Sequence, residues 1–194
     1  REQSEGEEPP ARDLKKEALG LILEGAIPAL VSAERADELA TALRLAEEFD
    51  FPLQIVGAAD AAVVLDRLAE AGVPILWGPP GDASLTGGPV FASAAAQGRN
   101  LEATPAALRD RGIPFALVTG DDAHAPRTDL LGMAALAIRG GLTPAQALEA
   151  ITLSPARFLG MDAELGSLEE GKAADMVFFD GDPFSPQTRV TAVW

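Results

Sequence analysis

The sequence has no cysteine, no tyrosine and a single histidine, His124, among its 194 residues. Without thiols, the chain forms no disulfide, no thiolate metal site and no cysteine nucleophile. One histidine also falls short of the three or four protein ligands that usually hold zinc. His124 stands close to Asp121 and Asp122, but ligands so near one another in sequence need a further ligand from elsewhere to complete a site.

Basic residues are also scarce, and no long hydrophobic run is present. Lys and Arg number 15 against 30 Asp and Glu, which gives a formal net charge of −15 at pH 7. Because this field repels polyanions, we expect neither a nucleic acid nor an anionic membrane surface as a partner. No apolar stretch approaches the roughly 20 residues of a membrane-spanning helix, so none is predicted.

Residues 1–12 differ in composition from the rest of the chain. The stretch reads REQSEGEEPPAR, which combines four glutamates with a Pro-Pro pair. Such a charged segment with few apolar residues stays solvated instead of packing into a core. We therefore predict an acidic linker or tail here, of the kind found inside a chain or at a cleaved end.

A pattern of proline followed by a mostly apolar run occurs four times after this tail. The runs cover residues 29–31, 53–56, 75–77 and 115–118. Proline is tolerated at the first residue of a strand, where its missing N–H costs little. Because the runs are apolar on both faces, they are typical of strands in a parallel sheet that is covered on both sides.

Segments with helical periodicity alternate with these strands. We predict helices at about 13–24, 36–49, 61–72, 104–112, 143–151 and 154–160. Their signals include a capping box of Thr143 with Gln146 and a terminating Gly72. Alternating strands and helices imply parallel strands joined by right-handed crossovers, so the predicted fold class is α/β.

The number of units bounds the architecture. A closed (β/α)8 barrel needs eight units and typically about 250 residues, whereas this sequence holds four. The chain is therefore either an open four-stranded sheet or half of a TIM-type barrel. A half barrel leaves two strand edges open, and open edges invite pairing with another strand. The half-barrel interpretation therefore predicts a partner, which is either an N-terminal half of the same protein or another subunit in an oligomer.

Residues 161–194 follow a different pattern and carry a family resemblance. Turns at Gly166 and Gly171 and the runs MVFFD and VTAVW predict a small β element. The string LGSLEEGKAADMVFFDGDP closely resembles the C-terminal signature of the amidohydrolase superfamily, in its imidazolonepropionase-like branch. The resemblance implies a (β/α)8 barrel with a small β-sandwich built from both chain ends. Residues 13–160 then correspond to barrel units five to eight, and residues 161–194 to the C-terminal strands of the sandwich.

The resemblance also implies a chemistry, which is hydrolysis of C–N bonds by water activated on one or two divalent metals. In this family an aspartate after the last strand handles protons, and Asp121 matches it, with Asp122 one residue on as the alternative. Histidine ligands are expected after strands five and six, where this sequence has Ser32 and either Gly57 or one of its neighbours. We therefore predict no metal ligand and no cofactor for this chain alone, and zinc only if a missing half supplies ligands.

Three further polar residues lie just past predicted strand ends and are candidates for substrate binding: Glu34, Asp60 and His124. In a barrel the carboxyl ends of all strands share one rim, where the sites of this fold lie. The alternative interpretation is structural, with Asp121 accepting hydrogen bonds from loop amides and His124 on a surface loop.

Three functions remain open from the sequence. The chain is half of a metal-dependent hydrolase, a degenerate member that serves as a scaffold or assembly subunit, or a module that binds a small molecule at the rim. The missing histidines favour a pseudoenzyme that is inactive by itself. Relatives in this branch often carry an export signal, so the resemblance favours a periplasmic or extracellular location.

Overall fold

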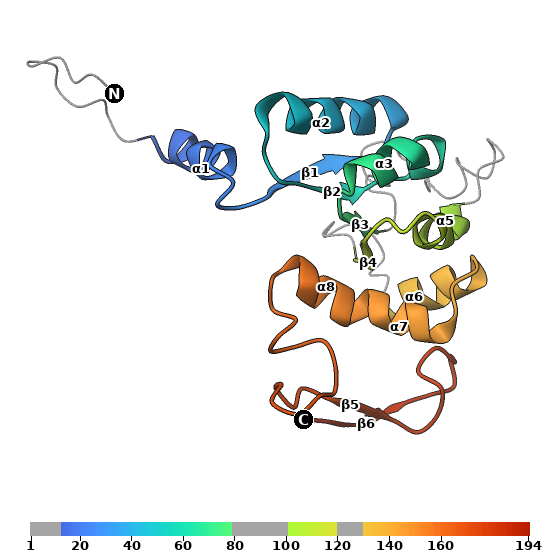
Figure 1. Cartoon of the computed structure of the whole chain (residues 1–194). Helices are drawn as coiled ribbons and strands as arrows, with labels where there is room; N and C mark the ends of the chain where they lie inside the picture. Colours follow the sequence, from blue (N-terminus) through green and yellow to red (C-terminus); the bar gives the residue numbers. More distant parts are fainter. Residues whose placement is uncertain (1–12, 79–100, 120–129) are drawn as a thin grey trace, which may run out of the picture.

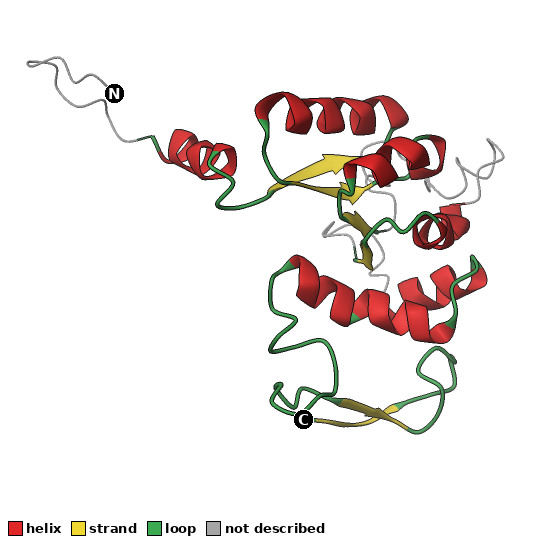
Figure 2. Cartoon of the chain, in the orientation of Figure 1, coloured by secondary structure: helices red, strands yellow, loops and turns green. Residues whose placement is uncertain are grey.

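The computed structural model of the chain describes residues 13–78, 101–119 and 130–194. Strands and helices alternate along the chain, and a short hairpin ends it (Figure 1, Figure 2). The strands are β1 (Ala29–Ala33), β2 (Leu53–Gly57), β3 (Ile75–Trp77), β4 (Phe115–Leu117), β5 (Val177–Phe179) and β6 (Val190–Val193). The helices are α1 (Leu14–Leu23), α2 (Ala36–Phe49), η1 (Ala61–Val63), α3 (Leu65–Ala71), η2 (Leu101–Ala103), α5 (Thr104–Asp110), α6 (Leu130–Arg139), α7 (Pro144–Ile151) and α8 (Leu153–Phe158), of which η1 and η2 are 3-10 helices.

Four parallel strands form one sheet in the order β1-β2-β3-β4, which confirms the predicted α/β class. Each strand starts directly after a proline. Proline has no N–H but keeps its carbonyl, so it begins a strand without interrupting the ladder. The proline carbonyls accept hydrogen bonds from the neighbouring strand: Ala29 N–H to Pro52 at 2.8 Å, Ile55 N–H to Pro74 at 3.0 Å and Ile75 N–H to Pro114 at 2.9 Å.

The core lies between the sheet and its helices. Leu39 of α2, Leu68 of α3 and Leu108 of α5 are fully buried in one cluster with Ile55 and Ile75 of the sheet. Burial of one such side chain contributes roughly 1.5–3 kcal/mol. Helices α2 and α3 lie along β1 and β2, while α5 to α8 gather at the β4 end of the sheet (Figure 1).

The other face of the sheet is only partly covered. In β1 the side chains alternate, and Leu30 and Ser32 are the exposed ones. The register places Ser32 opposite Val56, Val56 opposite Leu76, and Leu76 opposite Ala116. These four residues form one row across the face that looks into the interior of a closed barrel.

Helix α1 forms where it was predicted, but none of its residues is buried. Asp13 caps it by accepting hydrogen bonds from the amides of Lys15 and Lys16. Figure 1 shows the helix standing apart from the sheet. A solitary helix of this length is marginal in water, so its apolar side chains call for a covering element. Its four leucines lie on two sides of the helix and are 46–68% exposed: Leu14, Leu19, Leu21 and Leu23.

Helix boundaries differ from the prediction in three places. The segment 61–72 divides into η1 and α3. Helix α5 starts at Thr104 as the predicted segment 104–112 does, but it ends at Asp110 and follows η2 directly, and the Thr104 side chain is buried. Helix α6 was not predicted, since its sequence LLGMAALAIR carries little polar periodicity. No helix in the described ranges is long and apolar enough to cross a membrane.

Strands β5 and β6 pair antiparallel and confirm the small β element expected within residues 161–194. Their side chains Val177, Phe178, Val190 and Val193 are all exposed. A two-stranded hairpin is at best marginally stable alone, so this element, like α1, offers apolar surface for further packing.

Candidate functional site

The carboxyl ends of β1 and β2 bring two predicted rim residues together. Ala33 ends β1 opposite Gly57, the last residue of β2. Glu34 and Asp60 follow in neighbouring loops, and the Asp60 N–H donates to the Glu34 carbonyl at 2.8 Å. The Ala58 N–H donates to the Ala33 carbonyl at 2.7 Å. Backbone hydrogen bonds therefore hold the two loops against each other.

The Glu34 carboxylate lies directly over Gly57. Its Oε2 accepts a hydrogen bond from the Ala59 N–H at 3.0 Å. Gly57 has a positive φ of 101°, a conformation that L side chains rarely adopt. A Cβ atom at Gly57 would collide with the carboxyl group of Glu34. The space beside Gly57, one of the positions where the family resemblance expects an imidazole, is thus occupied by a carboxylate from the neighbouring loop.

The amino end of α2 is fastened to the same loops. Asp60 Oδ2 accepts from the N–H of Ala36, the first residue of α2, at 3.3 Å. Glu38 Oε2 accepts from the amides of Arg35 at 3.0 Å and Glu34 at 2.9 Å, and these hydrogen bonds hold the pKa of the Glu38 carboxyl below its usual value. Carboxylates at a helix N-terminus also interact favourably with its dipole. We call Glu34, Gly57, Ala59 and Asp60 the rim clamp.

Of the predicted site residues, the structure brings Glu34 and Asp60 together, both half-buried. Asp121, Asp122 and His124 lie outside the described residues. Ser32 is exposed on the uncovered face of β1. The catalytic role of Asp121 and the binding roles of Glu34, Asp60 and His124 stay predictions.

The described residues do not fit a metal ion. Within the ranges that the structure describes, no group of three or more His, Cys, Asp and Glu side chains is placed to bind one. At the positions where ligands are expected, Ser32 offers a hydroxyl, which is a poor zinc ligand, and Gly57 offers no side chain. The Glu34 and Asp60 carboxylates accept backbone amide hydrogen bonds instead.

Sequence reasoning missed Trp77 at the carboxyl end of β3. Its side chain is fully buried, and its indole N–H has no hydrogen-bond acceptor in the part of the chain that the structure describes. A buried donor without an acceptor costs about 1–3 kcal/mol. The next residue, Gly78, packs tightly on Val118, since a Cβ there would lie 3.0 Å from the Val118 Cγ2. The Trp-Gly pair at the end of the strand was the available sequence signal.

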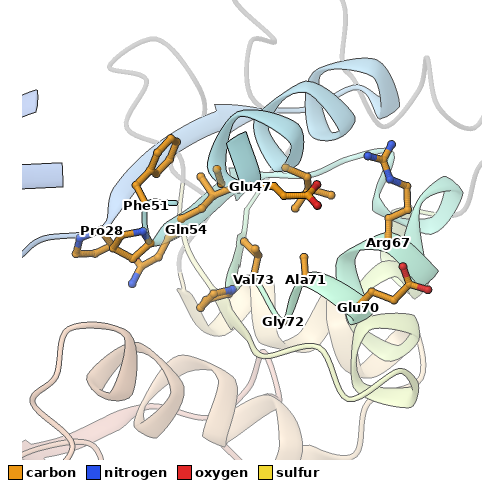
Figure 3. Close-up of a pocket in the computed structure, with 14 residues that line it drawn as sticks. Pro28, Glu47, Phe51, Gln54, Arg67, Glu70, Ala71, Gly72 and Val73 are labelled. Carbon is orange, nitrogen blue, oxygen red and sulfur yellow. The ribbon is translucent and has the colours of Figure 1, made fainter. Parts of the chain in front are cut away.

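A surface groove of about 660 Å³ lies at the opposite end of the sheet (Figure 3). Its wall combines the end of α2, the start of β2 and the end of α3, with Phe51 and Val73 in it and the exposed Glu47, Arg67 and Glu70 around it. Ligands of parallel α/β folds bind at the carboxyl ends of the strands. The groove therefore does not replace the rim as the candidate site.

The chain consists of parallel β/α units, whose loops are joined at the carboxyl rim of the sheet, and a C-terminal β element. This combination defines a class of barrel-related α/β proteins. The model of the amidohydrolase family matches residues 58–194. The chain belongs to this family, which confirms the resemblance found in the sequence.

The chain is similar to much longer proteins. Over 187 residues it is 28% identical to amidohydrolase tasK of Hapsidospora irregularis, and the aligned region covers 94% of this chain and 18% of that protein. Over 75 residues it is 40% identical to the imidazolonepropionase of Geobacillus kaustophilus, covering 38% of this chain and 18% of that protein. A solved amidohydrolase structure from Thermotoga maritima superposes with a TM-score of 0.79 at 34% identity, covering 98% of this chain and 47% of that one. The chain thus spans less than half the length of each of these relatives.

Proposed function

We propose that the chain forms units five to eight of an amidohydrolase barrel together with the C-terminal strands of its sandwich. The fold supports this proposal, since a four-stranded parallel sheet followed by an antiparallel pair matches nearly the whole chain to 47% of the Thermotoga maritima structure. The open edges of β1 and β4 are then the places where the remaining barrel units pair.

By its family, the complete assembly belongs with hydrolases of amide and related C–N bonds. The 194 residues by themselves are not such an enzyme, and the observation that carries this proposal is the rim clamp. Glu34 fills the space over Gly57 and is held there by the Ala59 amide. A side chain at residue 57 would have to displace the Glu34 carboxylate, and Gly57 itself offers no ligand atom. We infer that the ligands for a metal come from outside the described residues. The chain acts as a structural half whose Asp121 serves protons only in the complete assembly.

The test is hydrolysis by the purified chain supplied with zinc or manganese, against a panel of amide and imide substrates. Wild type, Asp121→Asn and the surface control Asp162→Asn are compared at equal folded concentration. We expect all three to be equally inactive. Turnover in wild type and in Asp162→Asn that disappears in Asp121→Asn would show that this chain alone carries a working site.

A further inference from the structure

The groove at the amino end of the sheet lies away from the rim and is built from neighbouring units of this chain (Figure 3). Its floor is apolar, since Leu43, Leu53 and Val73 are at most 8% exposed and the half-buried Phe51 lines it as well. Strand β2 pairs on both sides within the chain, and α2 and α3 directly precede and follow it. These walls therefore do not depend on the strands that pair at the β1 and β4 edges. The volume of about 660 Å³ lies within the range of small-molecule sites, roughly 300–1,000 Å³.

Two helices end at this groove, and neither end carries the positive charge that it favours. The last turns of α2 and α3 contain no basic residue. They contain Glu47 and Glu70 instead, and both glutamates line the groove. The carbonyl groups at the carboxyl end of a helix carry a partial negative charge, which attracts a cation and repels a carboxylate. Each glutamate thus adds to the negative potential of its own helix end, and the two helix ends together attract a cation.

The two carboxylates are not neutralised within the part of the chain that the structure describes. Glu47 and Glu70 are exposed there and make no ion pair or side-chain hydrogen bond, whereas Glu48 bonds to Arg44 at 2.7 Å. Arg67 is the one basic residue among the described residues of the groove, and it is unpaired within the same ranges. Figure 3 shows Arg67 and Glu70 along α3, with Glu47 extending from α2 towards them. Two carboxylates and one guanidinium leave the groove with one net negative charge.

We propose that this groove binds an apolar primary amine, with the ammonium group between Glu47 and Glu70 and the hydrocarbon body along Phe51 and Val73. An alkyl ammonium has a pKa near that of lysine, about 10.4, so it is charged at neutral pH. Burial of the hydrocarbon body against the floor is favourable. The charged end stays at the exposed mouth, as the heads of long amphipathic side chains do. Arg67 repels the ammonium group and therefore limits the affinity.

The ligand is a small amine or the amino terminus of an apolar peptide, because both present this chemistry. The site is separate from the rim clamp and requires no metal, so it goes beyond the proposed function. The chain carries a net charge of −15, which attracts any cation over a long range. Binding in the groove is therefore distinguished from this general attraction by variants that change one charge inside the groove or one charge outside it.

Binding to the full chain is measured by titration calorimetry at pH 7 and about 0.02 M salt, where surface charges are only weakly screened. The probes are phenylbutylamine, its neutral analogue phenylbutanol and its anionic analogue phenylbutyrate. We expect a Kd of about 1 mM for the amine, binding at least about fivefold weaker for the alcohol, and still weaker binding for the anion. An apolar dipeptide amide with a free amino terminus forms the peptide arm, and its N-acetylated form is the control.

Single-charge variants then locate the amine. Glu47→Gln and Glu70→Gln should each weaken its binding about threefold, and the double variant about tenfold. Arg67→Gln should strengthen binding about threefold, because it removes the repulsion. The matched control is Asp162→Asn, which removes one negative charge from a residue outside the groove and should leave the Kd unchanged. All four side chains are exposed, so the variants are expected to fold, and circular dichroism checks that they do.

The signs of these changes decide the outcome. Equal binding of the amine and the alcohol overturns the proposal, and so does the absence of any binding. Weaker binding by Arg67→Gln, or an equal loss in Asp162→Asn and in the glutamate variants, overturns it as well. If the expected pattern is found, tighter binding of phenylbutylamine than of the dipeptide amide identifies a small amine as the ligand, and the reverse order identifies a peptide amino terminus.

Discussion

Replacement of Gly57 by alanine tests the rim clamp directly. Gly57 has a φ of 101°, and a non-glycine residue at positive φ costs about 1–2 kcal/mol. The added Cβ also displaces the Glu34 carboxylate from the Ala59 N–H, which it meets at 3.0 Å. A hydrogen bond to a charged group contributes about 1.5–3 kcal/mol, and the lower half of that range applies because Glu34 is only half-buried. We expect Gly57→Ala to lower the free energy of unfolding by about 2–4 kcal/mol.

Gly72→Ala is the matched control. Gly72 also has a positive φ, of 61°, but nothing lies within 4 Å of a Cβ placed there. Its cost is therefore only the backbone strain of about 1–2 kcal/mol. The free energies are measured by urea unfolding followed by circular dichroism, at one protein concentration so that any association is held constant.

A double-mutant cycle identifies the collision as the cause. In a Glu34→Ala background the carboxylate is absent, so Gly57→Ala should cost no more than Gly72→Ala. The expected coupling energy between residues 34 and 57 is about 1–2 kcal/mol. Equal destabilisation by Gly57→Ala and Gly72→Ala, with no coupling energy in the cycle, would show that the Glu34 carboxylate does not pack against Gly57 as described.

Two further predictions concern other parts of the fold. Thr143 accepts a hydrogen bond from the Gln146 N–H at the start of α7. Thr143→Ala should therefore lower the free energy of unfolding by about 1 kcal/mol, whereas Thr143→Ser, which keeps the hydroxyl, should retain most of the wild-type stability. Equal stability of all three proteins in urea unfolding would contradict the cap. The Arg139 guanidinium holds the pKa of the Glu102 carboxyl below its usual value by a hydrogen bond. A carboxyl whose pKa is lowered in the folded state stabilises the fold at pH values above its unfolded pKa of about 4.3. This contribution to stability is lost as the pH falls through the folded-state pKa. Thermal unfolding of Arg139→Gln should therefore show a lower Tm than wild type at neutral pH and converge with it in acid, and a difference that persists unchanged at low pH would refute the pairing.

The strands were predictable because their signal is local. Proline fixes its own φ and has no N–H to donate to a neighbouring strand. A strand therefore begins just after a proline, and the apolar runs after Pro28, Pro52, Pro74 and Pro114 mark the strand starts. Helix α6 was missed although it also has a local signal, since its Leu, Ala and Met residues are strong helix formers. Its mostly apolar sequence leaves few polar positions to mark the helical period.

The arrangement at the rim was only partly predictable. The sequence places Glu34 and Asp60 just after strand ends, and the parallel order of β1 and β2 then makes them neighbours. The orientation of the Glu34 carboxylate depends on the Ala59 amide, 25 positions further along the chain. A contact of that separation leaves no local pattern, so a rim carboxylate available to a substrate and one bonded to a loop amide look alike in sequence.

The number of metal ions bound per chain tests the central claim most directly. The purified chain is equilibrated with zinc, freed of unbound metal by gel filtration and measured by elemental analysis. Because Ser32 and Gly57 stand where imidazole ligands are expected and Glu34 is held by the Ala59 amide, the account predicts far less than one zinc per chain, unchanged in Asp121→Asn. One zinc per chain that is lost in Asp121→Asn and retained in Asp162→Asn would contradict it.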